Sequence, residues 1–379
     1  MLIDNPFPVT RYASPSLFCD REQELAILTG ALRNGRHILL YSPRRFGKTG
    51  LIHHTFNTLA KDRGTRTVFA DIYAARDVHD FNTILVNAVH AALNPTVKQF
   101  LRNAGEWFGA LRPTVSFDEL SGKPRIGLER AEISREAATT TEIFRILNEQ
   151  DRTIYLAIDE FQQVAQFANV RMDALLRSEL QRSPRVHCIF SGSQRHLLLE
   201  MFTDVSSPLY HSADQLSLGR IERDTYSRFA VRVMKRHGRD LALDDARFCY
   251  DWCNGHTYHV QVLFNRLFGD ARPLSRDTIV QVMLGIVREQ DAMMATLRST
   301  LPGNQWDLYA AIAREGPVDT PTAGAFMRKH GLSSSAAVVQ AMKALLDKEL
   351  VYVSGHLEDS GKPVYETYDP FLRNWFRHR

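Results

Sequence analysis

The sequence predicts an α/β protein in which a parallel sheet covered by helices precedes two smaller, mainly helical regions. Short apolar runs alternate with helical patterns, the runs are apolar throughout, and runs of this kind stop after Gly219. Alternation of strands with helices is typical of a parallel sheet. Runs that are apolar at every residue, rather than at every second one, indicate strands that are buried on both faces.

Four segments are continuous apolar runs of strand length, and a fifth, Asp214–Leu218, could complete the sheet. Residues 94–140 hold several Pro and Gly residues and show little periodicity, so we expect an irregular insertion there. The predicted sheet domain spans residues 1–219. The four apolar runs are Ile38–Tyr41, Thr67–Ala70, Ile154–Ile158 and Val186–Phe190.

Helical periodicity dominates residues 220–301, and we expect a small helical domain there. Residues 302–379 have the outline of a winged helix, which is three helices followed by a two-stranded hairpin. The predicted helices of the first region are Thr225–His237, Leu243–Cys253, Thr257–Phe268 and Ser275–Ser299. Those of the second are Trp306–Arg314, Thr322–His330 and Ser333–Leu346, followed by the strands Leu350–Val353 and Val364–Tyr368.

Composition and charge narrow the class of protein. The 379 residues are 44% hydrophobic and 24% charged, an ordinary globular balance, and no apolar run approaches the length of a bilayer span. The N-terminus has no secretion signal and four cysteines are too few for a disulfide framework, so we expect a cytoplasmic protein without a membrane partner. The net charge is only +4, and residues 302–379 carry nine basic and nine acidic side chains, which does not favour binding to DNA.

Residues 42–50 have the features of a phosphate-binding loop between a strand and a helix. They read Ser42-Pro43-Arg44-Arg45-Phe46-Gly47-Lys48-Thr49-Gly50 and nearly match G-x-x-x-x-G-K-[ST]. Backbone amides of such a loop point at phosphate oxygens, and Gly47 permits their close approach. Lys48 would contact the β and γ phosphates, and the Thr49 hydroxyl would bind Mg²⁺. Ser42 replaces the first glycine of the pattern and would be strained if that position required a positive φ.

Two carboxylates follow the predicted strand Ile154–Ile158. Ligands of α/β proteins bind at the carboxyl edge of the sheet, where Asp159 and Glu160 would therefore lie. Asp159 would hold Mg²⁺ through water, and Glu160 would orient and deprotonate an attacking water. The polar segment Ser191–Arg195 follows the next strand, and Ser193 there could sense the γ-phosphate, although a plain turn with a Ser cap would look the same.

These motifs together resemble the archaeal-type P-loop ATPase family, a group related to AAA+ and STAND ATPases. The resemblance spans nearly the whole chain. It implies a sheet order 5-1-4-3-2, a helical lid over residues 220–301 and a C-terminal winged helix over residues 302–379. It also implies that Phe18–Glu22 lies near the adenine, which makes Phe18 and Arg21 candidate nucleotide contacts. The matching pieces are Asn5–Phe7, Phe18–Glu22, Pro43–Thr49, Ile158–Glu160, Ser191–Ser193, Gly255–Tyr258 and Tyr368–Trp375.

Three points stay open at the level of sequence. An arginine from a neighbouring subunit could assist hydrolysis, and the candidates are Arg171, Arg177, Arg182 and Arg195. Cysteines and histidines between Cys249 and His259 have a spacing that invites a zinc site, but Gly255 would end the helix that carries the cysteines. The predicted third helix of the winged helix offers serines, Gln340 and Lys343 but no arginine for guanine, which favours a protein-docking role over DNA reading.

The sequence therefore predicts an ATP-binding, Mg²⁺-dependent ATPase that acts as a molecular switch of the AAA+/STAND-like type. ATP would bind and turn over at the loop, with hydrolysis open to dependence on a partner, and the lid and winged helix would move in response. The expected partner is another protein or a second copy of this chain. The alternative is a nucleotide-gated DNA-binding regulator or initiator-like protein that uses its winged helix.

Overall fold

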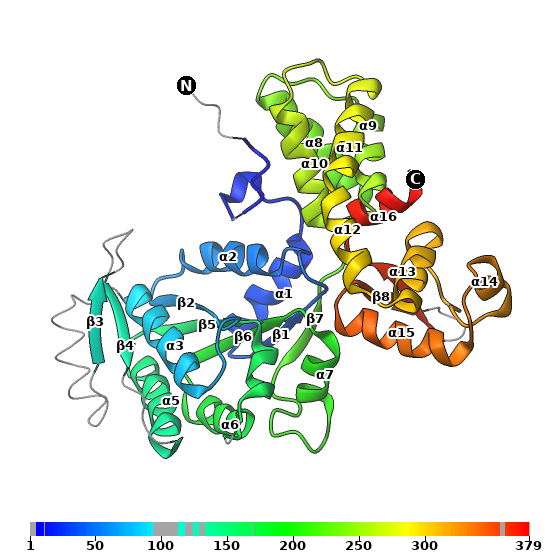
Figure 1. The fold of residues 1–379 in the computed structure, drawn as a ribbon. Coiled ribbons are helices and arrows are strands. Elements are labelled where there is room, and N and C mark those ends of the chain that lie inside the picture. Colours follow the sequence, from blue (N-terminus) through cyan, green and yellow to red (C-terminus); the bar gives the residue numbers. More distant parts are fainter. Residues whose placement is uncertain are drawn as a thin grey trace. The chain divides into compact units, whose positions relative to one another are not determined.

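The computed structural model describes residues 5–10, 12–93, 113–117, 124–128, 133–168, 170–356 and 361–378. The chain divides into two compact units (Figure 1). One consists of residues 12–219, which we call the sheet unit. The other, the C-terminal unit, combines residues from 220 onward with residues 5–10. Among the described residues, no helix has both the length and the hydropathy that a membrane crossing needs.

The sheet unit is built on five parallel strands in the order β2-β5-β6-β1-β7. Numbered along the chain within this sheet alone, that order is 5-1-4-3-2 when read from the other edge, so the predicted topology is confirmed. The strands are β1 (Ile38–Tyr41), β2 (Thr65–Asp71), β5 (Thr153–Asp159), β6 (Val186–Gly192) and β7 (Asp214–Ser217).

Both faces of the sheet are buried, which explains why its strands are apolar at consecutive positions. Leu39 and Tyr41 of β1 pack into one core cluster, whereas Ile38 and Leu40 pack into another on the opposite face. Helices α3, α5, α6 and α7 contribute to the first cluster, and α1 and α2 to the second (Figure 1). The helices are α1 (Glu22–Arg33), α2 (Lys48–Leu59), α3 (Val78–Leu93), α5 (Ile133–Asn148), α6 (Met172–Arg182) and α7 (Arg195–Thr203), with short 3₁₀ turns η1 (Pro15–Leu17) and η2 (Phe161–Gln166).

The segment that we expected to be an irregular insertion, residues 94–140, contains regular structure. An antiparallel hairpin joins β3 (Pro113–Phe117) to β4 (Pro124–Leu128), and helix α5 begins at Ile133. The expectation of irregularity was therefore wrong for these residues. The Pro and Gly residues on which it rested include Pro113, Pro124 and Gly127 of the strands themselves. Proline is tolerated at the first residue of a strand, where Pro113 and Pro124 lie. The remaining residues of this segment lie outside the described part of the chain.

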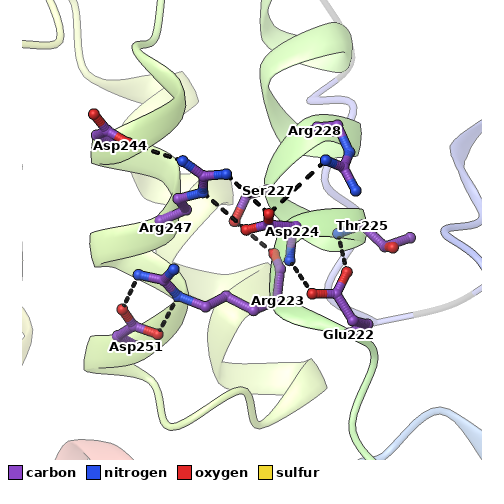
Figure 2. A network of polar contacts seen from close by, with 9 residues as sticks. All are labelled: Glu222, Arg223, Asp224, Thr225, Ser227, Arg228, Asp244, Arg247 and Asp251. Atoms are coloured by element: carbon purple, nitrogen blue, oxygen red, sulfur yellow. Dashed lines mark hydrogen bonds and ion pairs between the residues drawn. The ribbon is translucent and has the colours of Figure 1, made fainter.

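Ion pairs connect the first two helices of the lid (Figure 2). Arg247 of α9 pairs with Asp224 of α8 at 2.8 Å, and Arg223 pairs with Asp251 in the same way. Glu222 caps α8 by accepting the amides of Asp224 and Thr225. The lid helices are α8 (Arg223–Arg236), α9 (Leu243–Trp252), α10 (Thr257–Gly269) and α11 (Arg276–Glu289), and α12 (Asp291–Thr300) follows them.

The stretch Ser275–Ser299, expected as one helix, is two. Helix α11 ends where the amide of Gln290 bonds to the carbonyl of Val287, three residues back, and α12 starts at the next residue. Helix α11 packs against both α10 of the lid and α16 of the winged helix, and Met294 of α12 is buried in the core of the winged helix.

The winged helix has the predicted three helices and hairpin, followed by a helix that we did not predict, α16. Its signal was present in the sequence: Asp369 caps it by accepting the amides of Phe371 and Leu372, and Pro370 takes the first helical position. The elements are α13 (Gly303–Glu315), α14 (Gly324–Lys329), α15 (Ser335–Asp347), β8 (Val351–His356), β9 (Pro363–Thr367) and α16 (Pro370–Arg377).

Polar contacts join the lid to the winged helix within the C-terminal unit. The buried His259 of α10 bonds through Nε2 to Asp369 Oδ1 at 3.1 Å. The terminal carbonyl of α9, on Trp252, accepts bonds from the side chains of Arg373 and Asn374 at 3.2 and 2.9 Å. Arg220 and Glu366 add an ion pair at 2.6 Å. We call this set of residues (Arg220, Trp252, His259, Glu366, Asp369, Arg373 and Asn374) the lid–wing joint.

Candidate nucleotide-binding site

The loop between β1 and α2 has the local geometry that phosphate binding requires. Positive φ angles fall at Arg45 (62°) and Gly47 (99°) and not at Ser42, so the serine at the first glycine position is unstrained. Gly47 occupies the N-cap of α2, where no side chain caps the helix, and no acidic residue lies in the first turn. The start of α2 therefore has the positive end of the helix dipole and no side-chain cap, which are features of helix ends that bind anions.

Lys48 lies at the centre of the loop and is 5% exposed. Its Nζ donates to the carbonyl oxygens of Ser42 at 3.1 Å and Pro43 at 3.3 Å, and to the Ser42 hydroxyl at 3.3 Å. The ammonium group is thus held beside the carbonyl oxygens of its own loop. One cation and the positive end of the α2 dipole converge here, which favours a polyanionic ligand.

Thr49 and Asp159, the predicted magnesium residues, are in direct contact. Thr49 Oγ1 donates to Asp159 Oδ2 at 2.7 Å, and Ser191 Oγ donates to Asp159 Oδ1 at 2.6 Å. These hydroxyl and carboxylate oxygens are the ligand type that Mg²⁺ takes, commonly with only one or two carboxylates plus substrate phosphates. The described residues hold no cluster of three or more His, Cys, Asp or Glu side chains that would form a protein-only metal cage. The residues present fit magnesium shared with a nucleotide.

Glu160 and Ser193 also meet at this edge of the sheet. Ser193 Oγ donates to Glu160 Oε2 at 3.1 Å, and Gln162 Nε2 donates to the same oxygen at 2.5 Å. Arg44 of the phosphate loop reaches Ser193 with its Nε at 3.4 Å. The structure therefore brings the predicted base, the predicted sensor and the loop together, and adds Gln162, which sequence reasoning missed.

Asp71 is a second residue that sequence reasoning missed. It ends β2 in register with Asp159 at the end of β5. Burial raises the pKa of Asp71, and the nearby charges of Asp159 and Glu160 raise it further against a lowering bond from the Tyr73 amide. Its position directly after a predicted strand was the available signal, but the pairing of β2 with β5 was needed to place it beside the other two carboxylates.

Phe18 lies against the first turn of α2. A Cβ added to Gly50 would lie 3.5 Å from the Phe18 ring, and this ring stacks on His54 with 4.3 Å between centroids. Arg21 is 4% exposed, and its guanidinium donates to the Gly219 carbonyl at 2.6 Å and to Glu24 at 2.9 Å. Phe18 is thus placed beside the loop helix, whereas Arg21 ties the start of α1 to the end of the sheet. Contact of either residue with a nucleotide stays a prediction.

The fold and the site together define the class of this protein, an ATP-binding P-loop ATPase with a helical lid and a C-terminal winged helix. Residues 18–263 match the family model described as "ATPase domain predominantly from Archaea", which is more than half of the chain. The chain belongs to this family. Residues 292–378 match a second model, "Probable winged helix domain". The family predicted from the sequence motifs is thereby confirmed.

Solved structures share the fold at low sequence identity. The chain is similar to a Walker-type ATPase of Pyrococcus abyssi, with a TM-score of 0.64, 18% identity and coverage of 98% of this chain and 99% of the other. It is also similar to the ORC2 protein of Aeropyrum pernix in ADPNP and ADP complexes (TM-score 0.57, 11% identity, 99% and 98% coverage). The ORC1 protein of the same organism, in complex with DNA, gives a TM-score of 0.52 at 12% identity over 96% and 94% of the two chains. No curated protein matches the chain.

Proposed function

We propose that this ATPase is a nucleotide-dependent molecular switch that hydrolyses ATP with Mg²⁺ and transmits the nucleotide state through the C-terminal unit. The observation that carries the proposal is the hydrogen bond from Thr49 Oγ1 to Asp159 Oδ2 at 2.7 Å. Thr49 directly follows Lys48 in the sequence, and Asp159 directly precedes Glu160. A phosphate-binding loop, a metal-ligand pair and a candidate base therefore lie at one edge of the sheet, as hydrolysis at a γ-phosphate requires.

Each residue of the site has a distinct task in this reaction. The loop amides and Lys48 bind the β and γ phosphates, and Thr49 with Asp159 would hold Mg²⁺, which neutralises charge on the phosphate oxygens. Glu160 orients a water molecule whose oxygen bonds to the γ-phosphorus as the bond from phosphorus to the bridging oxygen of ADP breaks. The water proton passes to the Glu160 carboxylate, and ADP and phosphate leave. Ser193 holds Glu160 and responds to the γ-phosphate.

The lid–wing joint supports a movement in which the lid and the winged helix turn together as one rigid body. The buried His259 bonds to Asp369, and side chains of α16 cap α9, so the lid and the winged helix are connected by specific, partly buried polar contacts. A change that moves the lid would carry the winged helix with it. The partner that reads this movement is a protein or a second copy of the chain.

The surface of α15 favours a protein partner over DNA. Its exposed residues include Val339, which is 59% exposed, together with Gln340 and Lys343. A single lysine on this helix supplies little of the phosphate neutralisation on which DNA affinity depends. The second candidate, a nucleotide-gated DNA-binding regulator, is favoured by the winged helix itself and by the likeness to the ORC1 protein solved with DNA.

The test compares the trapped ATP state with the ADP state. The Glu160→Gln variant is measured by small-angle X-ray scattering with Mg²⁺ and either ATP or ADP. We expect different distance distributions for the two nucleotides, whereas identical curves would contradict a switch. Light scattering of the same samples detects self-association.

Fluorescence anisotropy with duplex DNA at physiological salt decides between the two candidates. We expect affinity no tighter than the non-specific range of about 10⁻⁴–10⁻⁶ M, with or without ATP. Nanomolar, ATP-dependent binding that Lys343→Ala weakens would establish the DNA-binding alternative instead.

A further inference from the structure

Gln162 is a buried polar residue of the site to which the reaction above assigns no task. It follows Phe161, whose ring packs on Phe190 of β6 with 4.6 Å between centroids, and this packing fixes the start of η2. The Gln162 side chain is 1% exposed, and its Nε2 donates to Glu160 Oε2 at 2.5 Å. Burial of an amide that bonds to a carboxylate two residues away restricts both side chains.

The bonds to Glu160 are asymmetric. Gln162 and Ser193 both donate to Oε2, and within the described residues no side chain or amide donates to Oε1. The backbone of Glu160 is left-handed, with φ of 58°, and its amide donates to Asp159 at 3.1 Å. The carboxylate is therefore held from one side with its second oxygen left to accept a proton, which is the arrangement that a general base needs.

Close packing against Gly192 positions the oxygen of the Gln162 amide. Its Oε1 lies over Gly192 at the end of β6, where an added Cβ would approach it to 2.0 Å. This oxygen is buried and makes no hydrogen bond within the described part of the chain. A glutamine whose oxygen stays unbonded in a buried position carries a cost of desolvation. The hydrogen bond that the Gln162 side chain does make runs from its Nε2 to Glu160 Oε2.

We propose that Gln162 is a positioning residue for ATP hydrolysis, which holds the Glu160 carboxylate so that Oε1 faces the attacking water. The glycine at position 192 makes room for it. The inference rests on the proposed role of Glu160 as the base. Misplacing a catalytic group by about 1 Å can lower a rate by about 10²-fold, so loss of this bond should lower kcat by about 10- to 10²-fold.

Gln162→Met is the decisive variant, because methionine has a similar length and volume but donates no hydrogen bond. Single-turnover hydrolysis of Mg-ATP with enzyme in excess is measured in the wild-type background and in Glu160→Gln. We expect a lower rate with unchanged ATP affinity in the wild-type background, and no further decrease in Glu160→Gln. Gln162→Glu, which places two carboxylates together, should lower the rate at least as much.

The outcomes separate this inference from the function on which it rests. A wild-type rate in Gln162→Met, or an equal fractional loss in both backgrounds, would overturn the positioning role. A wild-type rate in Glu160→Gln alone would instead remove Glu160 as the base.

Gly192→Ala, a substitution at the end of β6, tests the inference without changing position 162. The new methyl group would displace the Gln162 amide and also lie 3.0 Å from Leu198. Gly192→Ala should lower kcat in the wild-type background. In the Gln162→Ala background, where the clashing amide is absent, the same substitution should lower kcat much less. Equal losses in both backgrounds would count against the proposal.

Discussion

Buried polar side chains serve differently in two regions of this protein, the nucleotide site of the sheet unit and the lid–wing joint of the C-terminal unit. In the site, donors and acceptors come from adjacent strand ends and a loop, and several converge on single atoms, as Gln162 and Ser193 do on Glu160 Oε2. In the joint, pairs such as His259 and Asp369 connect segments more than a hundred residues apart. The difference fits the roles we propose, in which the site binds a nucleotide and the joint connects the lid to the winged helix.

The largest effect should follow from Lys48→Ala in the site. The variant removes the cation that would face the β and γ phosphates, and the loss of one partner of a buried charge pair costs about 2–5 kcal/mol of binding free energy. Isothermal titration calorimetry with Mg-ATP measures it. Thermal stability without nucleotide should change less than ATP affinity, because Lys48 Nζ donates to carbonyl oxygens of its own loop. Unchanged ATP affinity would place the nucleotide elsewhere.

An intermediate effect is expected at the joint, where Asp369→Asn keeps a good helix cap but removes the charge beside His259. The bond from His259 becomes a bond to a neutral acceptor, and because charge-assisted bonds are roughly twice as strong as neutral ones, the change should cost about 1 kcal/mol of unfolding free energy at neutral pH. Asp369→Ala, which also removes the cap, is the matched variant and should cost more. Both should bind ATP like the wild type, and reduced ATP affinity would show that site and joint are not independent.

The pH dependence of the same pair has a defined sign. Burial raises the pKa of Asp369, but the bond from His259 and two backbone amides outweigh it and hold the pKa below its usual value. The ionised carboxylate therefore stabilises the folded chain above the pKa of an unfolded aspartate, about 3.9, and this contribution is lost as the pH falls through the lower folded pKa. The stability difference between wild type and Asp369→Asn should shrink over that acidic window. A difference that is constant down to pH 2 would contradict the assignment.

The smallest effect should come from Arg247→Ala in the charged network between α8 and α9 (Figure 2). Arg247 pairs with Asp224 and Asp244 near solvent, and exposed ion pairs contribute little because water and salt screen them. We expect a smaller decrease in melting temperature than in Asp369→Asn, and a decrease that high salt removes. A loss equal to that at the joint would show that the two networks carry similar weight.

Much of the fold could be predicted because its signals are local or motif-based. Continuous apolar runs located β1, β2, β5 and β6, and the family resemblance supplied the order of the sheet. The break at Gln290 was missed because the residues on both sides of it are helical and no proline or glycine marks it. The hairpin β3–β4 was missed because proline and glycine were taken as loop signals.

The site was predictable where chemistry is carried by contiguous residues. Lys48 and Thr49 lie in one loop, and Asp159 with Glu160 follows one strand, so their meeting required only a parallel sheet. Asp71 and Gln162 were missed for a different reason. The first acts through strand register and the second through a close contact with Gly192, and neither relation is visible in residue spacing.

The central claim is that ATP is hydrolysed beside Thr49 and Asp159 with Glu160 as the base. Single-turnover hydrolysis of Mg-ATP by Glu160→Gln, measured together with ATP affinity, tests it most directly. General-base catalysis predicts a rate lower by about 10²–10⁴-fold with the affinity retained. A rate equal to that of the wild type at the same affinity would contradict the account.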